Sequence, residues 1–535
     1  MGPFATVKGA RILLVGFTFL GHAAGQAVSG IQTLQGSGPI FGNEVRSAGD
    51  VDGDGVADFL AGDGSMLHVY SGAPGTPLLF SVQGMLGSTA GDADGDGLDD
   101  LLVGSPFPFP GGARVVSGVD GHTIFSFAQP PTAIRYGSSI GVAGDSDLDG
   151  LLELFVGDPQ DFGAKGYVEL RDGATGSLMF TLTDDLPDTS FGSTGSVSGV
   201  GDVNLDGFDD LAAGSLSDDT GGLQAGAVRV FAGQDGSVLR LVTGASFDFL
   251  GRLVTALGDV DLDGCPDFAA AASNADYARV YSGAAATALH DVKGGQAGWL
   301  FPASMSGAGD ADGDGIGELV IGTYENTTTA CPLFGPPVVG PGMVRIHAAG
   351  SGALLAQLSG VGGAGDRYGT AVAGAGDLDG DGCAEILVGA NDCAPDDGYL
   401  QIVSLFCDKL PALALGLAQP GGPTSLKIVN LGGQPGDLYF TALTLDPANE
   451  GAGFGTGFWG GLHISLPELQ AQLGSAAPPF VGLLDAQGES GFYLTPGTLP
   501  AALVNVTLYG VTHTIDLAAF GAVSGVSPVT ALAIQ

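Results

Sequence analysis

Seven short acidic segments carry the clearest chemical signal in the sequence. The frame D-x-[DN]-x-D-G-x-x-[DE] begins at Asp50, Asp92, Asp145, Asp202, Asp259, Asp310 and Asp377. Four acids in one short loop repel one another by several kcal/mol at close range unless a cation neutralises them. Oxygen ligands from a flexible loop favour Ca²⁺ over Mg²⁺. The frame therefore predicts up to seven calcium sites, and the alternative is seven acidic, solvated turns without an ion.

The expected ligands are the side chains at frame positions 1, 3, 5 and 9 and the backbone carbonyl at position 7. Glycine at position 6 is expected to take the left-handed turn that aims this carbonyl inward. Asn204 replaces one carboxylate, so we expect the fourth site to bind more weakly. The expected ligand residues are Asp50, Asp52, Asp54, Val56 and Asp58; Asp92, Asp94, Asp96, Leu98 and Asp100; Asp145, Asp147, Asp149, Leu151 and Glu153; Asp202, Asn204, Asp206, Phe208 and Asp210; Asp259, Asp261, Asp263, Cys265 and Asp267; Asp310, Asp312, Asp314, Ile316 and Glu318; Asp377, Asp379, Asp381, Cys383 and Glu385.

Strand-forming segments surround each frame. An aromatic-glycine pair such as Phe41-Gly42 precedes it, and an apolar run such as Phe59-Leu60-Ala61 follows it. Two further apolar segments follow, for example Val228 to Phe231 and Leu239 to Val242. The frames recur every 42 to 67 residues, which is room for four short strands with turns. Four strands per repeat is the content of one propeller blade.

This order of aromatic-glycine strand, Asp-rich loop and apolar-glycine strand resembles the FG-GAP repeats of integrin α-subunit propellers, here in a secreted bacterial type. The resemblance covers about Gly30 to Phe406. It implies an all-β, seven-bladed β-propeller with calcium-binding loops and a role in ligand binding or cell adhesion. The integrin-type D-x-S-x-S motif and an RGD tripeptide are both absent.

The ends of the repeat array predict how the ring closes. Only two strands, Ile386 to Val388 and Tyr399 to Leu405, follow the seventh frame, so one blade lacks its fourth strand. The segment Gly30 to Gly36 precedes the first aromatic-glycine pair and has no blade of its own. We expect it to complete blade seven and so cover the open edge.

The first residues are typical of an export signal. Lys8 and Arg11 precede the apolar stretch Ile12 to Leu20, and Gly25-Gln26-Ala27 is a suitable cleavage site. No later segment has the 18 or more apolar residues of a membrane span. The expected organisation is a signal peptide at 1–27, the propeller at 28–408 and a C-terminal β-rich domain at 411–535. We expect an exported protein, secreted or at the cell surface, monomeric and without a membrane span.

Composition narrows the range of partners. The chain has 58 acids against 16 Lys and Arg, a formal charge of −42, and such a field repels nucleic acid. Apolar residues make up 44 %, which excludes a disordered acidic chain. The 96 glycines favour an all-β protein with many tight turns.

No catalytic constellation is evident. Gly137-Ser138-Ser139-Ile140-Gly141 matches a nucleophile elbow, yet it lies where the other repeats place a blade strand. His68, His290 and His347 are scattered and lack metal-ligand spacing. The sequence therefore predicts no catalytic residues.

Five cysteines leave at least one thiol unpaired if export permits disulfides. Pairing of Cys331 with Cys393 competes with pairing of Cys393 with Cys407. We expect Cys265 and Cys383 to be small packed thiols.

The repeat stops near Pro411, and the remaining strand-like segments suggest a compact β-sandwich. These segments are Ser425 to Val429, Leu438 to Leu445, Phe480 to Leu484, Leu503 to Tyr509 and Val529 to Ile534.

Three functions remain open. The first is a non-enzymatic extracellular module that binds an unknown protein or glycan, with the loop Tyr324 to Gly342 as the expected contact surface. The second is a polysaccharide-active enzyme of the lyase type, which needs a base and a cation in one pocket. The third is a purely structural exported scaffold.

Overall fold

The computed structural model describes the propeller residues 28–36, 40–73, 75–107, 111–127, 129–160, 164–184, 186–187, 189–294, 299–325, 342–360, 367–391 and 398–405. Beyond residue 405 it describes only the strands between 412 and 534. The predicted signal peptide, most of the predicted contact loop, and Cys331, Cys393 and Cys407 lie outside the described residues.

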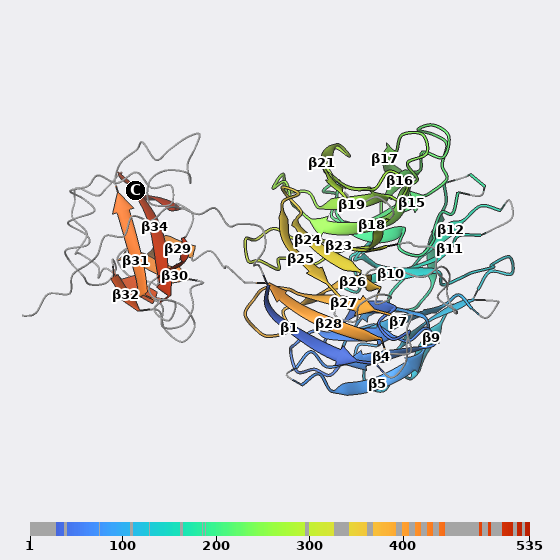
Figure 1. Cartoon of the computed structure of the whole chain (residues 1–535), viewed down its shortest axis with the longest axis horizontal. Coiled ribbons are helices and arrows are strands. Elements are labelled where there is room, and N and C mark those ends of the chain that lie inside the picture. The colour runs from blue at the N-terminus through green and yellow to red at the C-terminus, as the bar shows by residue number, and fades with distance from the viewer. Residues whose placement is uncertain are drawn as a thin grey trace, which may run out of the picture.

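Seven four-stranded antiparallel sheets form the first part of the chain (Figure 1). The strands of blades 1 to 3 are β2 (Glu44–Gly49), β3 (Asp58–Gly62), β4 (Met66–Tyr70), β5 (Leu78–Gln83); β6 (Leu86–Gly91), β7 (Asp100–Ser105), β8 (Gly112–Val116), β9 (Thr123–Ser126); β10 (Ser139–Gly144), β11 (Glu153–Asp158), β12 (Tyr167–Arg171) and β13 (Leu178–Leu182). Those of blades 4 to 7 are β14 (Val197–Gly201), β15 (Asp210–Ser215), β16 (Ala227–Phe231), β17 (Val238–Thr243); β18 (Leu250–Gly258), β19 (Asp267–Ala272), β20 (Tyr277–Tyr281), β21 (Ala288–Lys293); β22 (Trp299–Gly307), β23 (Glu318–Glu325), β24 (Met343–Ala348), β25 (Leu354–Ser359); β26 (Tyr368–Gly376), β27 (Glu385–Ala390), β28 (Tyr399–Leu405) and β1 (Val28–Gln35).

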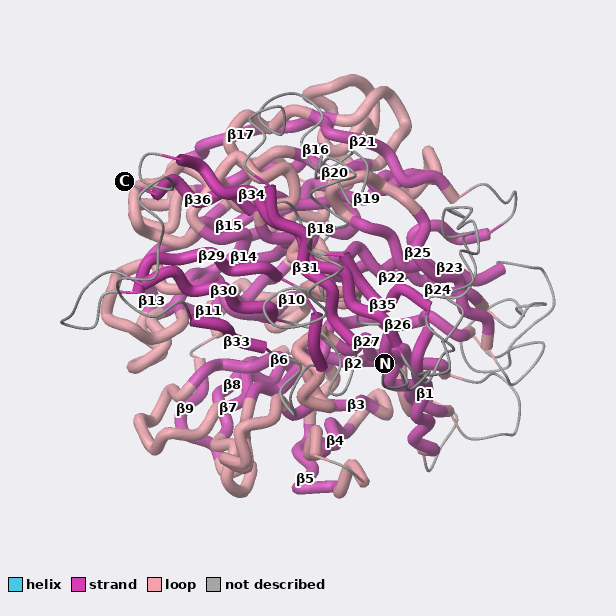
Figure 2. Tube along the Cα trace, turned by 90° about the vertical axis from the view of Figure 1, so that its left-hand side faces the viewer, coloured by secondary structure: helices cyan, strands magenta, loops and turns pink. Residues whose placement is uncertain are grey.

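The first strand after each blade boundary lies innermost. Strands β2, β6, β10, β14, β18, β22 and β26 contact one another in this order, and β26 contacts β2, which closes the ring. Figure 2 shows these strands around the centre and the outer strands β5, β9, β17 and β21 at the rim. The predicted seven-bladed, all-β propeller is confirmed.

The N-terminal strand completes the last blade, as the sequence predicts. Strand β1 pairs antiparallel with β28, with Ile31 opposite Val403 and Gln35 opposite Tyr399. Figure 1 shows β1 in blue beside β28 in orange. The order of this sheet is β1-β28-β27-β26, so the two ends of the repeat array share one blade.

The hydrophobic core lies between blades. Each of seven clusters of buried side chains joins residues of two neighbouring blades. The cluster between blades 7 and 1, for example, contains Leu387 and Leu400 of blade 7 and Phe41 and Phe59 of blade 1. The strands bury both faces in this way, so the ring is held together by side-chain packing at every junction.

The C-terminal strands form two further sheets. One has the order β29-β30-β33, and the other has the order β32-β31-β34-β35 with β36 beside β34. Their bounds are β29 (Ala412–Ala418), β30 (Ser425–Leu431), β31 (Leu438–Thr444), β32 (Val481–Leu483), β33 (Ser490–Tyr493), β34 (Val506–Asp516), β35 (Ala522–Val526) and β36 (Thr530–Ile534). Five of these strands overlap the predicted segments, while the predicted sandwich packing stays a prediction.

One cysteine prediction is wrong. Cys383 is disulfide-bonded rather than a packed thiol, and its partner lies outside the described residues. Cys383 lies two residues before β27 (Glu385–Ala390), which pairs with β28 with Ile386 opposite Val403. Cys265 is a free, buried thiol, as expected.

Within the described part of the chain, no helix has the length and apolar character needed to cross a membrane.

Removing β1 should destabilise blade 7, where the ring closes. A chain that begins after Gln35 leaves the edge of β28 unpaired, and unpaired edges recruit other chains. We expect a lower urea midpoint and concentration-dependent association in sedimentation experiments, compared with a control chain that begins at Val28. Equal midpoints and a monomeric truncated chain would contradict the closure.

Candidate metal centres

Each acidic frame forms the connection between the inner strand of a blade and the second strand. In blade 1 the loop runs from Gly49, the end of β2, to Asp58, the start of β3. Because strands in an antiparallel blade alternate in direction, all seven loops lie on one face of the ring, together with the turns between the third and fourth strands. We call this face the acidic-loop face.

Three residues in every loop have a positive φ. The predicted left-handed glycine at position 6 is confirmed in all seven loops, at Gly55, Gly97, Gly150, Gly207, Gly264, Gly315 and Gly382. The glycine before each frame also has a positive φ, at Gly49, Gly91, Gly144, Gly201, Gly258, Gly309 and Gly376.

Position 4 is the third such residue, and its backbone conformation was not among the features predicted from the sequence. It is glycine in four loops, but Leu148, Leu205 and Leu262 occupy it in blades 3 to 5 with φ of 66°, 59° and 61°. A leucine in this region of backbone space carries a steric cost. The glycines at position 4 of the other four loops are the sequence feature that could have predicted a positive φ here.

The first carboxylate of each frame organises the turn. In blade 1 Asp50 Oδ2 accepts a hydrogen bond from the N–H of Gly55 at 2.9 Å, and Oδ1 accepts one from the N–H of Gly53 at 2.8 Å. The bond from position 6 to position 1 recurs in all seven loops, at 2.7 to 3.2 Å. These bonds draw the backbone around the carboxylates and bring the acidic side chains to one side of the loop.

Positions 3 and 5 each use one oxygen in the same way. Asp52 accepts from the N–H of Asp54, and Asp54 accepts from the N–H of Val56. In blade 4 Asn204 Nδ2 donates to Asp206 at 3.0 Å, a bond within the frame that a carboxylate at this position could not make. This contact is consistent with a weaker fourth site.

The ninth residue of the frame is a buried acid in every blade, with an exposed fraction of 0 to 2 %. One of its oxygens accepts from the N–H of position 2, as in Asp58 with Val51 at 2.8 Å, and this bond recurs in all seven blades. Where the acid is Asp, the second oxygen accepts from a glycine N–H between the third and fourth strands, such as Gly72 at 2.9 Å. This carboxylate therefore joins two connections of its blade.

The glutamates at position 9 differ. The second oxygen of Glu153 and that of Glu318, both Oε1, are buried and have no hydrogen-bond partner within the described residues. Both side chains are fully buried. Leaving a buried carboxylate oxygen without a partner is costly in free energy. A cation bound at these two loops would supply the missing partner for each Oε1 atom.

Burial raises the pKa of these carboxyl groups, because the charged form loses its hydration. The pKa of Asp58, Asp100 and Asp210 is about 6, that of Glu153 and Glu385 about 7, and that of Glu318 about 8, and the pKa of Asp267 is also raised. Acids of the same frame raise these pKa values further. A divalent ion would act in the opposite direction by favouring the charged form.

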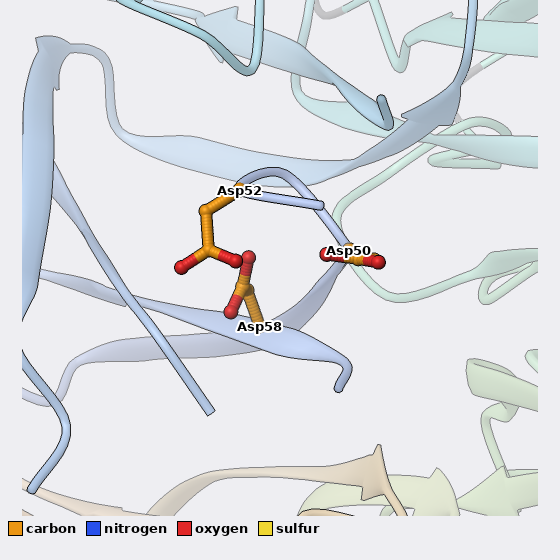
Figure 3. A group of neighbouring side chains, drawn as sticks. All are labelled: Asp50, Asp52 and Asp58. Carbon is orange, nitrogen blue, oxygen red and sulfur yellow. The ribbon is translucent and has the colours of Figure 1, made fainter. Parts of the chain in front are cut away.

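Carboxylate oxygens converge in several frames. Groups of three lie within 4.8 Å of one another in blades 1, 2, 3, 5 and 6. They come from positions 1, 3 and 9 in blades 1, 3 and 6, and from positions 1, 3 and 5 in blades 2 and 5. Figure 3 shows the carboxylates of Asp52 and Asp58 facing each other, with Asp50 beside them. An all-oxygen donor set of this kind fits a hard divalent cation.

Neighbouring loops are bonded to each other. Asp99, at position 8 in blade 2, accepts from the N–H of Asp50 at 2.8 Å and donates its own N–H to the Asp50 carbonyl. Asp209 of blade 4 makes the same two bonds with Asp145 of blade 3. The first expected ligand of one loop is thus held by the next blade.

Part of the chain is similar in sequence to two integrin α-subunits. No family model matches it. It is 30 % identical over 194 residues to integrin alpha-5 of Xenopus laevis, which covers 32 % of this chain and 18 % of that protein. It is 26 % identical over 239 residues to integrin alpha pat-2 of Caenorhabditis briggsae, covering 38 % of this chain and 19 % of the relative. The chain spans about a fifth of the length of the curated relatives it matches.

The side chains that suggested chemistry have structural partners. Ser139 is buried at the start of β10, Ser138 is buried immediately before it, and Ser138 Oγ donates to the Arg135 carbonyl at 2.6 Å. The predicted blade strand is confirmed at this place. His68 contacts Ser81 and Asp63.

The pKa values predict how the chelated protein responds to pH. The position-9 acids have folded pKa values above the unfolded values of about 4, so the folded state binds more protons between pH 4 and 8. Their contribution to stability is present below pH 4 and is lost as pH rises through the folded pKa values. In EDTA we expect a lower urea midpoint at pH 8 than at pH 5. This fall in the midpoint should be smaller in a Glu318→Gln variant. A midpoint that rises with pH in EDTA would contradict this assignment.

The bonds between loops predict a specific weak point. Asp209→Ala removes the acceptor of the Asp145 N–H, at a cost of about 1 kcal/mol for one such bond. We expect weaker calcium binding by calorimetry and a lower melting temperature in calcium. Asp235→Ala is the control, because this exposed acid bonds only within its own turn. Equal losses in both variants would show that Asp209 does not support the neighbouring loop.

Proposed function

We propose that this chain is a secreted, non-enzymatic calcium-binding propeller of the FG-GAP type that binds an extracellular ligand. The observation that carries the proposal is the repeated loop, in which three carboxylates converge in blades 1, 2, 3, 5 and 6 and the position-9 acid is buried in all seven blades. We assign the leader to 1–27, the propeller to 28–408 and a separate β-rich domain to 411–535. The integrin α-subunits matched by the chain support the ligand-binding assignment.

In this proposal Ca²⁺ supplies charge neutralisation and rigidity. The side chains at positions 1, 3, 5 and 9, with the carbonyl of position 7, would hold each ion, up to seven in all. Seven ions would cancel a third of the net charge of −42. The unpaired oxygens of Glu153 and Glu318 support direct coordination from position 9 in blades 3 and 6.

The opposite face offers a contact surface in the described residues. Phe247 and Leu223 have exposed fractions of 48 % and 57 %, and the N–H of Phe247 donates to the Leu223 carbonyl at 2.8 Å. Phe247 has a φ of 68°, a costly conformation for an aromatic residue. Strain at an exposed apolar residue motivates a binding role. We propose that this pair contacts a protein or glycan ligand.

The pairing of the cationic side chains supports the non-enzymatic assignment. Arg171 is bonded to Glu169, Arg229 to Asp218 and Arg279 to Asp291. A lyase needs a cation that is available to a substrate carboxylate, and these three are already neutralised.

Binding and turnover should be measured on the same calcium-loaded protein. On a glycan and cell-surface array we expect binding that EDTA abolishes and that Phe247→Ser weakens at least several-fold. Leu78→Ser is the control, because Leu78 is equally exposed but lies on the outer strand β5. With a polysaccharide panel we expect no unsaturated products or new reducing ends. Turnover that survives repurification and is lost on one pocket substitution would overturn the non-enzymatic assignment.

A further inference from the structure

One position in the outer strand changes its chemistry between blades. In blades 1 to 3 the third residue of this strand is phenylalanine, and it faces an apolar residue of the third strand: Phe80 opposite Val69, Phe125 opposite Val115 and Phe180 opposite Leu170. Each ring packs against a positive-φ glycine of the next blade, namely Gly121, Gly176 and Gly236. In blade 5 the same position holds His290, opposite Val280 and against Gly352.

A second histidine borders the same glycine. His347 is the next-to-last residue of β24, the third strand of blade 6, and takes the register position that Phe231 occupies in blade 4 and Tyr281 in blade 5. It has an exposed fraction of 7 %. Its Nδ1 lies 3.1 Å from the Gly352 carbonyl oxygen. Because a carbonyl only accepts, Nδ1 carries the proton and Nε2 presents a lone pair.

The remaining nitrogens are left without partners. The Nε2 atoms of both His290 and His347 are buried, and neither has a hydrogen-bond partner among the described residues. A Cβ on Gly352 would lie 2.6 Å from Cδ2 and 3.1 Å from Nε2 of His290, so that edge of the ring faces Gly352. Two buried, unpaired nitrogens are costly, whereas Phe80, Phe125 and Phe180 at the His290 position and Phe231 at the His347 position have no polar ring atoms.

Electrostatics favours neutral rings. Burial lowers the pKa of both histidines, and the pKa of His347 is lowered further by Arg345 and by His290. Neutral imidazole is the form that binds metals. The bond from Nδ1 to a backbone carbonyl is the support that orients many metal-binding histidines through their other nitrogen.

We propose that His290 and His347 bind a borderline transition-metal ion of the Zn²⁺ or Cu²⁺ class at the junction of blades 5 and 6. Imidazole nitrogen suits such ions, whereas the carboxylate loops suit calcium. The ion would join the outer strand of blade 5 to the third strand of blade 6 through the two Nε2 atoms.

The repeat supplies the matched substitutions. His290→Phe and His347→Phe introduce the residue found in equivalent positions of other blades. With calcium kept saturating, Zn²⁺ should raise the melting temperature of the unmodified protein and leave both variants unchanged. His68→Phe is the control, because both ring nitrogens of His68 have partners, and it should keep the full zinc-dependent rise. An equal rise in all four proteins would overturn the proposal.

Copper spectroscopy tests the ligands directly and does not depend on the phenylalanine variants folding. The EPR spectrum of the calcium-saturated protein with one equivalent of Cu²⁺ should show coupling to two imidazole nitrogens. The coupling should fall to one nitrogen or none in His290→Gln or His347→Gln. A spectrum with oxygen ligands only, or one unchanged by both substitutions, would show that the pair holds no metal.

Discussion

The fold depends on a buried carboxylate repeated seven times. Each position-9 acid lies at the start of a blade's second strand, out of contact with water, and bonds to the backbone of the acidic loop. In the Asp blades it also bonds to the turn between the third and fourth strands, as Asp58 does with Gly72. An anion buried in this way loses its hydration, and nearby acids increase the cost. Backbone N–H groups offset part of that cost, and a cation would offset more.

The same carboxylates connect local structure to the ring. The loops sit between inner strands that contact one another around the centre, and Asp99 and Asp209 bond each loop they serve to the preceding blade. Apolar clusters between blades supply the packing, and β1 closes the last junction. Calcium in the loops would therefore stabilise the junctions between blades. The proposed contact residues Phe247 and Leu223 lie on the opposite face of the ring.

Local sequence was enough to predict the features that depend on one loop or one repeat. The frame, the left-handed glycine at position 6 and the transfer of the first strand to the last blade could all be inferred by comparing copies. Features that depend on contacts between blades could not be inferred in this way. The bond from Asp209 to Asp145 and the approach of His290 and His347 to Gly352 depend on register and on the packing of one blade against the next. The disulfide at Cys383 was also missed, because the pairing of cysteines cannot be read from their spacing in the sequence. The expected ligand sets stay predictions, because the carbonyls of position 7 were inferred from spacing alone.

Thermal unfolding of the chelator-treated protein, as calcium is added back at neutral pH, is the most direct test of calcium binding by the acidic loops. Binding to the folded state alone raises stability by mass action. The account predicts that EDTA lowers the melting temperature by many degrees, that calcium restores it, and that Glu153→Gln and Glu318→Gln each recover less than the unmodified protein. A melting temperature that is the same in EDTA and in calcium would contradict the claim that these loops are metal centres.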